Sequence, residues 1–113
     1  MSRRVERVQS LIERVASRVI RREVDVPGDV LATVERAEVS SDLTHVKIFV
    51  SIYPETRRAS VERELRRQWS EIAGRIVAAL RMRERPHLDL RISEAASRLD
   101  RIGTLLDDGN EAA

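Results

Sequence analysis

The chain has 113 residues, a length that suits one domain with its own core but not two. It contains no cysteine, which excludes disulfides, thiolate metal sites and thiol catalysis. Its aromatic fraction is 3%, so few rings are present for an RNA-binding mode that stacks bases on several exposed aromatic side chains. No apolar run approaches the roughly 20 residues that span a bilayer, and the N-terminus lacks the apolar core of a signal peptide, so we expect a cytoplasmic protein without a membrane partner.

The formal net charge is only +2, but the charges are segregated along the chain. Residues 1–22 carry seven arginines against two glutamates, and residues 57–85 carry nine arginines against four glutamates. Lys47 is the one lysine, and this preference for arginine has two explanations, a compositional bias of the genome or a functional need. Guanidinium groups suit bidentate contact with phosphate, so the two basic segments are candidates for binding a phosphate-rich partner.

We expect the first helix over residues 3–22, because apolar residues recur there at three- and four-residue steps: Val5, Val8, Ile12, Val15 and Val19. A neighbouring stripe of the same helix gathers five arginines: Arg4, Arg7, Arg14, Arg18 and Arg22. Like charges four residues apart destabilise an isolated helix by roughly a few tenths of a kcal/mol each. A solvated face is the ordinary explanation of such charges, but five on one stripe favour a phosphate partner outside the protein.

Three strands are expected. After Pro27-Gly28 turns the chain, Val34 to Ile52 reads as two strands joined by a polar turn, Ser40 to Thr44. Apolar residues two apart share one face of the second strand, namely Val46, Ile48, Val50 and Ile52. Phe49 between them suggests that the opposite face is also partly covered, and the alternation over His87–Ile92 predicts the third strand.

Residues 56–83 predict a second helical region with an apolar stripe at Val61, Leu65, Trp69, Ile72, Ile76 and Leu80. This region is long for so small a domain, so we expect a break near Ser70 or Gly74, and Arg85-Pro86 should end the helix. A short final helix should follow Ser93, with the domain covering residues 1–108 and a tail at 109–113. The order of elements predicts an α+β two-layer sandwich.

Catalysis has little support in the sequence. His45 and His87 are the two histidines, and neither has the spacing of a metal ligand. Ser40, Ser41 and Asp42 lie too close to His45 in one turn to form a nucleophile, a base and an orienting group, so a side-chain-stabilised turn explains them better. No glycine-rich phosphate loop is present. We therefore expect no enzyme, no metal site and no cofactor.

The order of the expected elements is that of a type II KH domain. Five segments of the sequence carry a more specific resemblance. They are Arg4–Val8, the turn Val39–Leu43, Val46–Ser51, Leu80–Leu88 and Arg101–Leu106. Taken in order from about Arg3 to Leu106, they resemble the ribosome-binding factor A family, bacterial assembly factors of the small ribosomal subunit. Composition and periodicity alone indicate no more than a small α+β domain with arginine-rich helices.

The resemblance implies a KH-like fold that lacks the Gly-x-x-Gly loop of ordinary KH domains, and the four glycines of this chain contain no such pair. The family has an Ala-x-Gly kink between two helical segments. In an ungapped alignment this kink falls on Gln68, Trp69 and Ser70, so both small residues are replaced. A shifted alignment places it at Ile72-Ala73-Gly74 instead.

In function, the resemblance implies a monomeric factor that binds immature 30S subunits through 16S rRNA and assists late rRNA processing, with an assembly GTPase aiding its release. We expect nine arginines to hold folded rRNA by shape and charge: Arg4, Arg7, Arg14, Arg18, Arg66, Arg67, Arg81, Arg83 and Arg85. Affinity should then fall steeply with salt. Two alternatives stay open, a protein–protein adaptor for an acidic partner and a general KH-like binder of nucleic acid.

Overall fold

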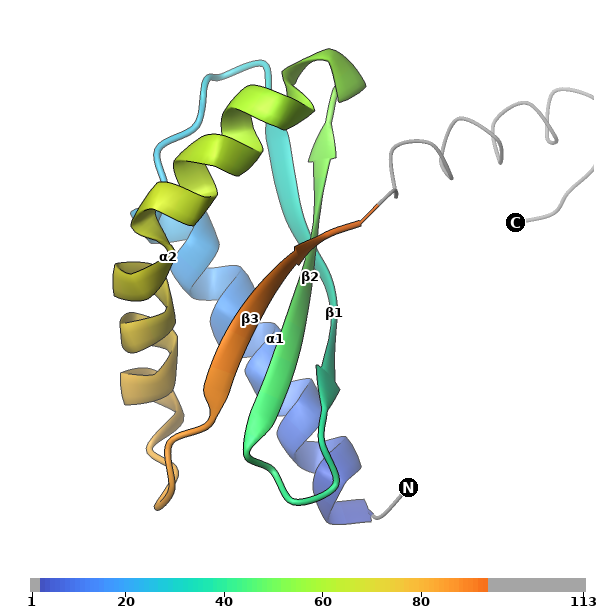
Figure 1. Ribbon diagram of the computed structural model, residues 1–113, viewed down its shortest axis with the longest axis vertical. Coiled ribbons are helices and arrows are strands. Elements are labelled where there is room, and N and C mark those ends of the chain that lie inside the picture. Colours follow the sequence, from blue (N-terminus) through green and yellow to red (C-terminus); the bar gives the residue numbers. More distant parts are fainter. Residues whose placement is uncertain (1–2, 94–113) are drawn as a thin grey trace, which may run out of the picture.

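Two helices cover one face of a three-stranded sheet in the computed structural model, which describes residues 3–93 (Figure 1). The elements follow in the order α1 (Arg3–Glu23), β1 (Leu31–Val39), β2 (His45–Tyr53), a 3-10 turn η1 (Glu55–Arg57), α2 (Arg58–Leu80) and β3 (His87–Ile92). This confirms the expected α+β two-layer arrangement. The expected C-terminal helix, the domain boundary at 108 and the tail at 109–113 lie outside the described residues.

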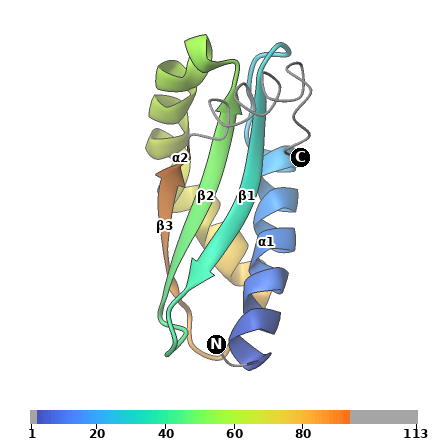
Figure 2. The ribbon, with the colours of Figure 1, turned by 90° about the vertical axis from the view of Figure 1, so that its right-hand side faces the viewer.

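The sheet has the order β1-β2-β3, with β2 in the centre. β1 pairs with β2 antiparallel through a short turn, whereas β2 pairs with β3 in parallel. Parallel neighbours need a crossover that returns the chain to the starting end of the sheet. Here α2 is that crossover, and it lies beside α1 on the same face (Figures 1 and 2).

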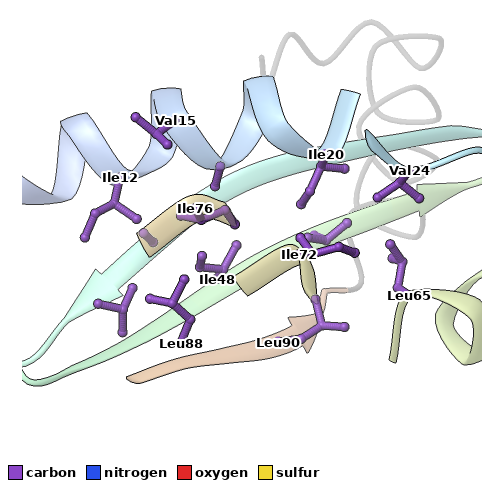
Figure 3. Close-up of a cluster of buried hydrophobic side chains, with 14 of the residues drawn as sticks. Ile12, Val15, Ile20, Val24, Ile48, Leu65, Ile72, Ile76, Leu88 and Leu90 are labelled. Atoms are coloured by element: carbon purple, nitrogen blue, oxygen red, sulfur yellow. The ribbon is translucent and has the colours of Figure 1, made fainter. Parts of the chain in front are cut away.

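The core lies between the helices and the inner face of β2, whose alternate residues Val46, Ile48, Val50 and Ile52 are each at most 1% exposed. Side chains from both helices converge on this face, as Figure 3 shows for Ile12 and Ile76 around Ile48. Burying each such side chain contributes about 1.5–3 kcal/mol. The opposite face of β2 is partly covered, as expected, because the guanidinium carbon of Arg36 lies 3.9 Å from the centre of the Phe49 ring.

The apolar stripe of α1 differs slightly from its sequence prediction. Val5, Ile12 and Val15 are buried as expected, but Ala16 and Ile20 are buried in place of Val8 and Val19, which are half-buried. The helix is therefore rotated so that the residues at four-residue steps, Ile12, Ala16 and Ile20, face the sheet. The arginine stripe is turned to solvent.

α2 ends earlier than predicted. Its last residue is Leu80, and Arg81 adopts a left-handed conformation with φ 56°, which ends the helix well before Pro86. The helix continues through Ser70 and Gly74 as one element, so the expected break does not divide it; instead α2 changes direction along its length (Figure 1). The placement of the kink at Gln68–Ser70, with Gly74 as the alternative, stays a prediction.

The turn between β1 and β2 is built around one carboxylate. Asp42 Oδ1 accepts hydrogen bonds from the Ser40 hydroxyl at 2.8 Å and from the Thr44 hydroxyl at 2.7 Å, and also from the Thr44 backbone N–H at 3.2 Å. Leu43 between them has a positive φ of 64°. These contacts explain the serines and the aspartate as turn residues. The Thr44 and Ser40 hydroxyls hold the pKa of Asp42 at about 2.

The outer edge of β3 is shielded by two side chains of α2. The backbone N–H of His87 donates to the Thr44 carbonyl, directly before β2, and that of Ser93 donates to the Val50 carbonyl of β2. In the alternating pattern of a strand, the backbone groups of Leu88 and Leu90 therefore point away from β2. The Trp69 indole Nε1 donates to the Leu88 carbonyl at 3.1 Å, and an Arg66 guanidinium nitrogen donates to the Leu90 carbonyl at 3.4 Å. Occupied carbonyls at an edge strand make pairing with another chain less favourable.

Replacing Thr44 with valine should raise the Asp42 pKa from about 2 towards the usual value near 4, because it removes the most important hydrogen-bond donor to the ionised carboxylate. Since a lowered pKa favours the folded state above the unfolded-state pKa, this contribution is complete above about pH 4 and is lost as the pH falls to about 2. Carboxyl-carbon NMR titration measures both midpoints. Equal midpoints in the two proteins would contradict this assignment.

Trp69→Phe should lower the free energy of unfolding by about 1 kcal/mol, because the Leu88 carbonyl loses its donor while most of the ring packing is kept. The matched control is Gln68→Ala, which removes a hydrogen bond to Glu64 of the same helix and should change stability by less than about 0.5 kcal/mol. Urea unfolding followed by circular dichroism gives both values. A Trp69 variant no less stable than the control would show that the indole does not hold β3.

Candidate nucleic-acid interface

The outward face of α1 carries a row of exposed arginines. Arg4, Arg7, Arg14 and Arg18 are all exposed, on the side of the helix opposite the buried residues Ile12, Ala16 and Ile20. Because the helix packs against the sheet and α2, its backbone and hence the spacing of these side chains are fixed. We call these four residues the α1 arginine row.

The α1 arginine row has no acidic partner among residues 3–93. Two of the glutamates of α1 are engaged elsewhere: a Glu13 carboxylate oxygen accepts the Ala37 backbone N–H of β1 at 2.9 Å, and Glu23 pairs with Arg75 of α2 at 3.1 Å. No ion pair within the described range joins any arginine of α1. The third glutamate, Glu6, lines a hollow with Arg7 and Arg14 but forms no ion pair with them, so this face keeps a net positive charge, which attracts anions.

Arg81, Arg83 and Arg85 extend this charge onto the loop between α2 and β3. All three are exposed, and none forms an ion pair within the described part of the chain. The loop lies at the same end of the molecule as the start of α1 and the β1–β2 turn (Figures 1 and 2).

These three segments line a cleft of about 530 Å³, formed by Arg4 and Val8 of α1, Ser41–Leu43 of the turn and Met82–Glu84 of the loop. We call it the end cleft. The fold thus brings the first arginine of the row and Arg83 to one cleft.

Arg66 and Arg67 differ from the other predicted arginines because both have local partners. Arg66 Nε bonds to Glu62 at 2.9 Å and a second nitrogen reaches the Leu90 carbonyl. Arg67 pairs with Glu64, which raises the pKa of the guanidinium and lowers that of the carboxylate. Each arginine would have to share or leave these partners to bind phosphate. Their role in RNA binding stays a prediction.

Sequence reasoning missed Arg21 as part of this face. With Arg14 it lines a second hollow, of about 440 Å³, between α1 and the edge strand β1, and the carboxylates of Glu13 and Glu35 line the same hollow. The sequence spacing could have indicated it, because Arg7, Arg14 and Arg21 follow one another at seven-residue steps and such residues share a helix face. The basic face is therefore wider than the five-arginine stripe alone predicted.

The two histidines lie next to each other on neighbouring strands. His45 and His87 lie side by side on β2 and β3, with ring centres 5.8 Å apart in an edge-to-face arrangement. Within residues 3–93 no group of histidine, aspartate and glutamate side chains is arranged to hold a metal ion. No helix in that same range is long and apolar enough to cross a membrane.

Comparisons with known proteins agree on one family. The sequence model described as Ribosome-binding factor A matches residues 4–106. Ribosome-binding factor A of Synechocystis sp. is 37% identical over 111 residues, covering 95% of this chain and 83% of that protein, and the protein of the same name from Rippkaea orientalis is 35% identical over 109 residues, covering 94% and 85%.

Among solved structures, the crystal structure of ribosome-binding factor A from Thermus thermophilus superposes with a TM-score of 0.64 at 23% identity, covering 78% of this chain and 94% of that one. At this identity the match shows the fold alone, and it confirms the KH-like arrangement expected from the order of elements. Together with the sequence matches, it shows that the chain belongs to the ribosome-binding factor A family.

Proposed function

We propose that this protein is an assembly factor of the small ribosomal subunit, which binds immature 30S particles through 16S rRNA and assists late rRNA processing in the cytoplasm. Its relatives are named for ribosome binding, which supports the general activity. The observation that carries the proposal is the α1 arginine row, which has no acidic partner among residues 3–93. A folded RNA supplies the missing negative charge.

The proposed contact is made with the RNA backbone. Phosphate contacts fix position and orientation but do not read sequence, and double-stranded RNA is recognised mainly by its shape. Arg7 and Arg14 lie two helical turns apart, which at 1.5 Å per residue spaces them by about 10 Å on a rigid element. Such a row can engage phosphates of a folded RNA without a Gly-x-x-Gly loop. In this proposal the protein is monomeric and not an enzyme, and an assembly GTPase aids its release.

Replacing the α1 arginine row with alanine should weaken binding to precursor small subunits and flatten its salt dependence. Each phosphate contact contributes about 0.9 to the slope of log K against log salt on a duplex, so losing four contacts lowers the slope by about 3.6. Co-sedimentation with precursor and mature subunits across a salt series measures this slope.

The matched control replaces four arginines that have local ion pairs, Arg36, Arg57, Arg58 and Arg91, with alanine. The change in net charge is the same, but the slope should stay close to that of the wild type. Equal losses in the two variants, or a wild-type affinity that does not respond to salt, would contradict the proposal.

Competition separates the two alternatives. A general binder of nucleic acid would be displaced from precursor subunits as effectively by unrelated duplex RNA or DNA as by precursor rRNA. A protein adaptor would not bind protein-free rRNA at any salt concentration. The proposal requires preferential binding to precursor particles and competition by their rRNA.

A further inference from the structure

The end cleft is lined by apolar, cationic and carboxylate side chains, whereas a simple anion needs only the cationic ones. Three of the five segments that carry the family resemblance meet there, although they are far apart in the sequence. Its volume of about 530 Å³ exceeds what one phosphate group fills. The cleft is therefore large enough for a whole nucleotide unit rather than for a backbone contact alone.

One part of the lining is apolar and one part is cationic. Val8, Leu43 and Met82 are half-buried, so part of each apolar side chain stays open to the cleft. Arg4 and Arg83 are exposed and have no ion-pair partner within residues 3–93. An apolar surface accepts the flat face of a base, and methionine adapts its shape to such surfaces. The two guanidinium groups suit the attached phosphate.

The third part of the lining consists of the carboxylates of Asp42 and Glu84. The hydrogen bonds that Asp42 accepts from Ser40 and Thr44 all end on Oδ1, which leaves Oδ2 clear of these donors. Carboxylates accept hydrogen bonds only, so they suit a base edge that presents adjacent donors. Guanine has two such donors, N1–H and the N2 amino group, whereas the single donor of uracil lies between two acceptors that a carboxylate repels.

The backbone supports the placement of these side chains. Leu43 and Arg81 are the two residues other than glycine with positive φ in the described part of the chain, at 64° and 56°. The first lines the cleft, and the second directly precedes Met82. The turn that contains Leu43 and the end of α2 at Arg81 thus fix the backbone on both sides of the cleft.

We propose that the end cleft binds one unstacked guanine nucleotide of the bound RNA. The base lies on Val8, Leu43 and Met82, the carboxylates of Asp42 and Glu84 accept its donor edge, and Arg4 and Arg83 hold the phosphate. The source of the nucleotide rests on the proposed function, since the RNA that supplies it is the rRNA of the small subunit. The α1 arginine row then provides affinity, and the cleft fixes the register on the RNA.

The test is an NMR titration of the ¹⁵N-labelled full chain with GMP, UMP and inorganic phosphate. GMP should shift the amide signals of residues 41–43 and 82–84 and bind at least about fivefold more tightly than UMP, because one well-formed pair of base contacts discriminates by about that much or more. Phosphate alone should shift signals near Arg4 and Arg83 but leave those of residues 41–43 unchanged. Equal responses to all three ligands, or no response at residues 41–43 and 82–84, would overturn the proposal.

Two variants sharpen this test. Met82→Asp places a charge on the apolar surface and should abolish the GMP response, and its spectrum away from the loop shows whether it folds. Glu84→Gln, at an exposed position, should bring the ratio of GMP to UMP affinity close to one. A Glu84 variant that keeps the full preference would show that this carboxylate does not select guanine.

Co-sedimentation distinguishes failure of the cleft from failure of the proposed function. Met82→Ser, which removes apolar surface and leaves the net charge unchanged, should weaken binding to precursor subunits without reducing the salt slope. If the variant binds as tightly as the wild type, the cleft proposal is wrong while the assembly-factor proposal stands. If the wild type itself does not bind subunits, the proposed function is wrong, and the nucleotide titration still decides the cleft.

Discussion

The parallel pairing of β2 with β3 is the constraint on which the architecture of this protein depends. A parallel neighbour can be reached only by a crossover, and α2 supplies it on the face that α1 already covers. α2 returns the chain to the end of the sheet where α1 begins and where β1 turns into β2, so the loop after Leu80 lies at that end. Arg4, Asp42 and Arg83 meet at the end cleft because of this return.

The acidic residues divide the arginines into two groups. On α2, Glu62, Glu64 and Glu71 each bind an arginine of the same helix, which makes its surface charge largely self-compensated. On α1, Glu13 supports the edge strand and Glu23 reaches across to α2, so the α1 arginine row keeps its charge. The small net charge of the whole chain therefore hides a face that is strongly basic.

Local periodicity explains what could be predicted from the sequence. The alternation of Val46, Ile48, Val50 and Ile52 predicted the floor of the core, and His87–Ile92 was predicted with the bounds that the structure has. The early end of α2 was missed because Arg81 adopts a left-handed conformation that usually signals itself through glycine. The contact from Trp69 to Leu88 could not be predicted, because it joins a helix to an edge strand whose register only the fold determines.

In the candidate site, too, features within one helix could be predicted and features that join distant segments could not. The α1 arginine row could be predicted, since its spacing is a property of one helix. The pairing of Arg66 with Glu62 and of Arg67 with Glu64 follows from their spacing of four and three residues along the helix. The end cleft could not be predicted, because three distant segments form it and none is distinctive alone.

The most direct test of the central claim, that the outward face of α1 lies on rRNA, uses the absence of cysteine from the chain. A single cysteine can be introduced at Ser10, which is exposed among the arginines of α1, or at Lys47, which is exposed on the opposite face of the sheet. Each is labelled with an iron chelate that cleaves nearby RNA. The account predicts cleavage of 16S rRNA in bound precursor subunits from Ser10→Cys and little from Lys47→Cys. Cleavage from Lys47→Cys alone would place the opposite face on the RNA and contradict it.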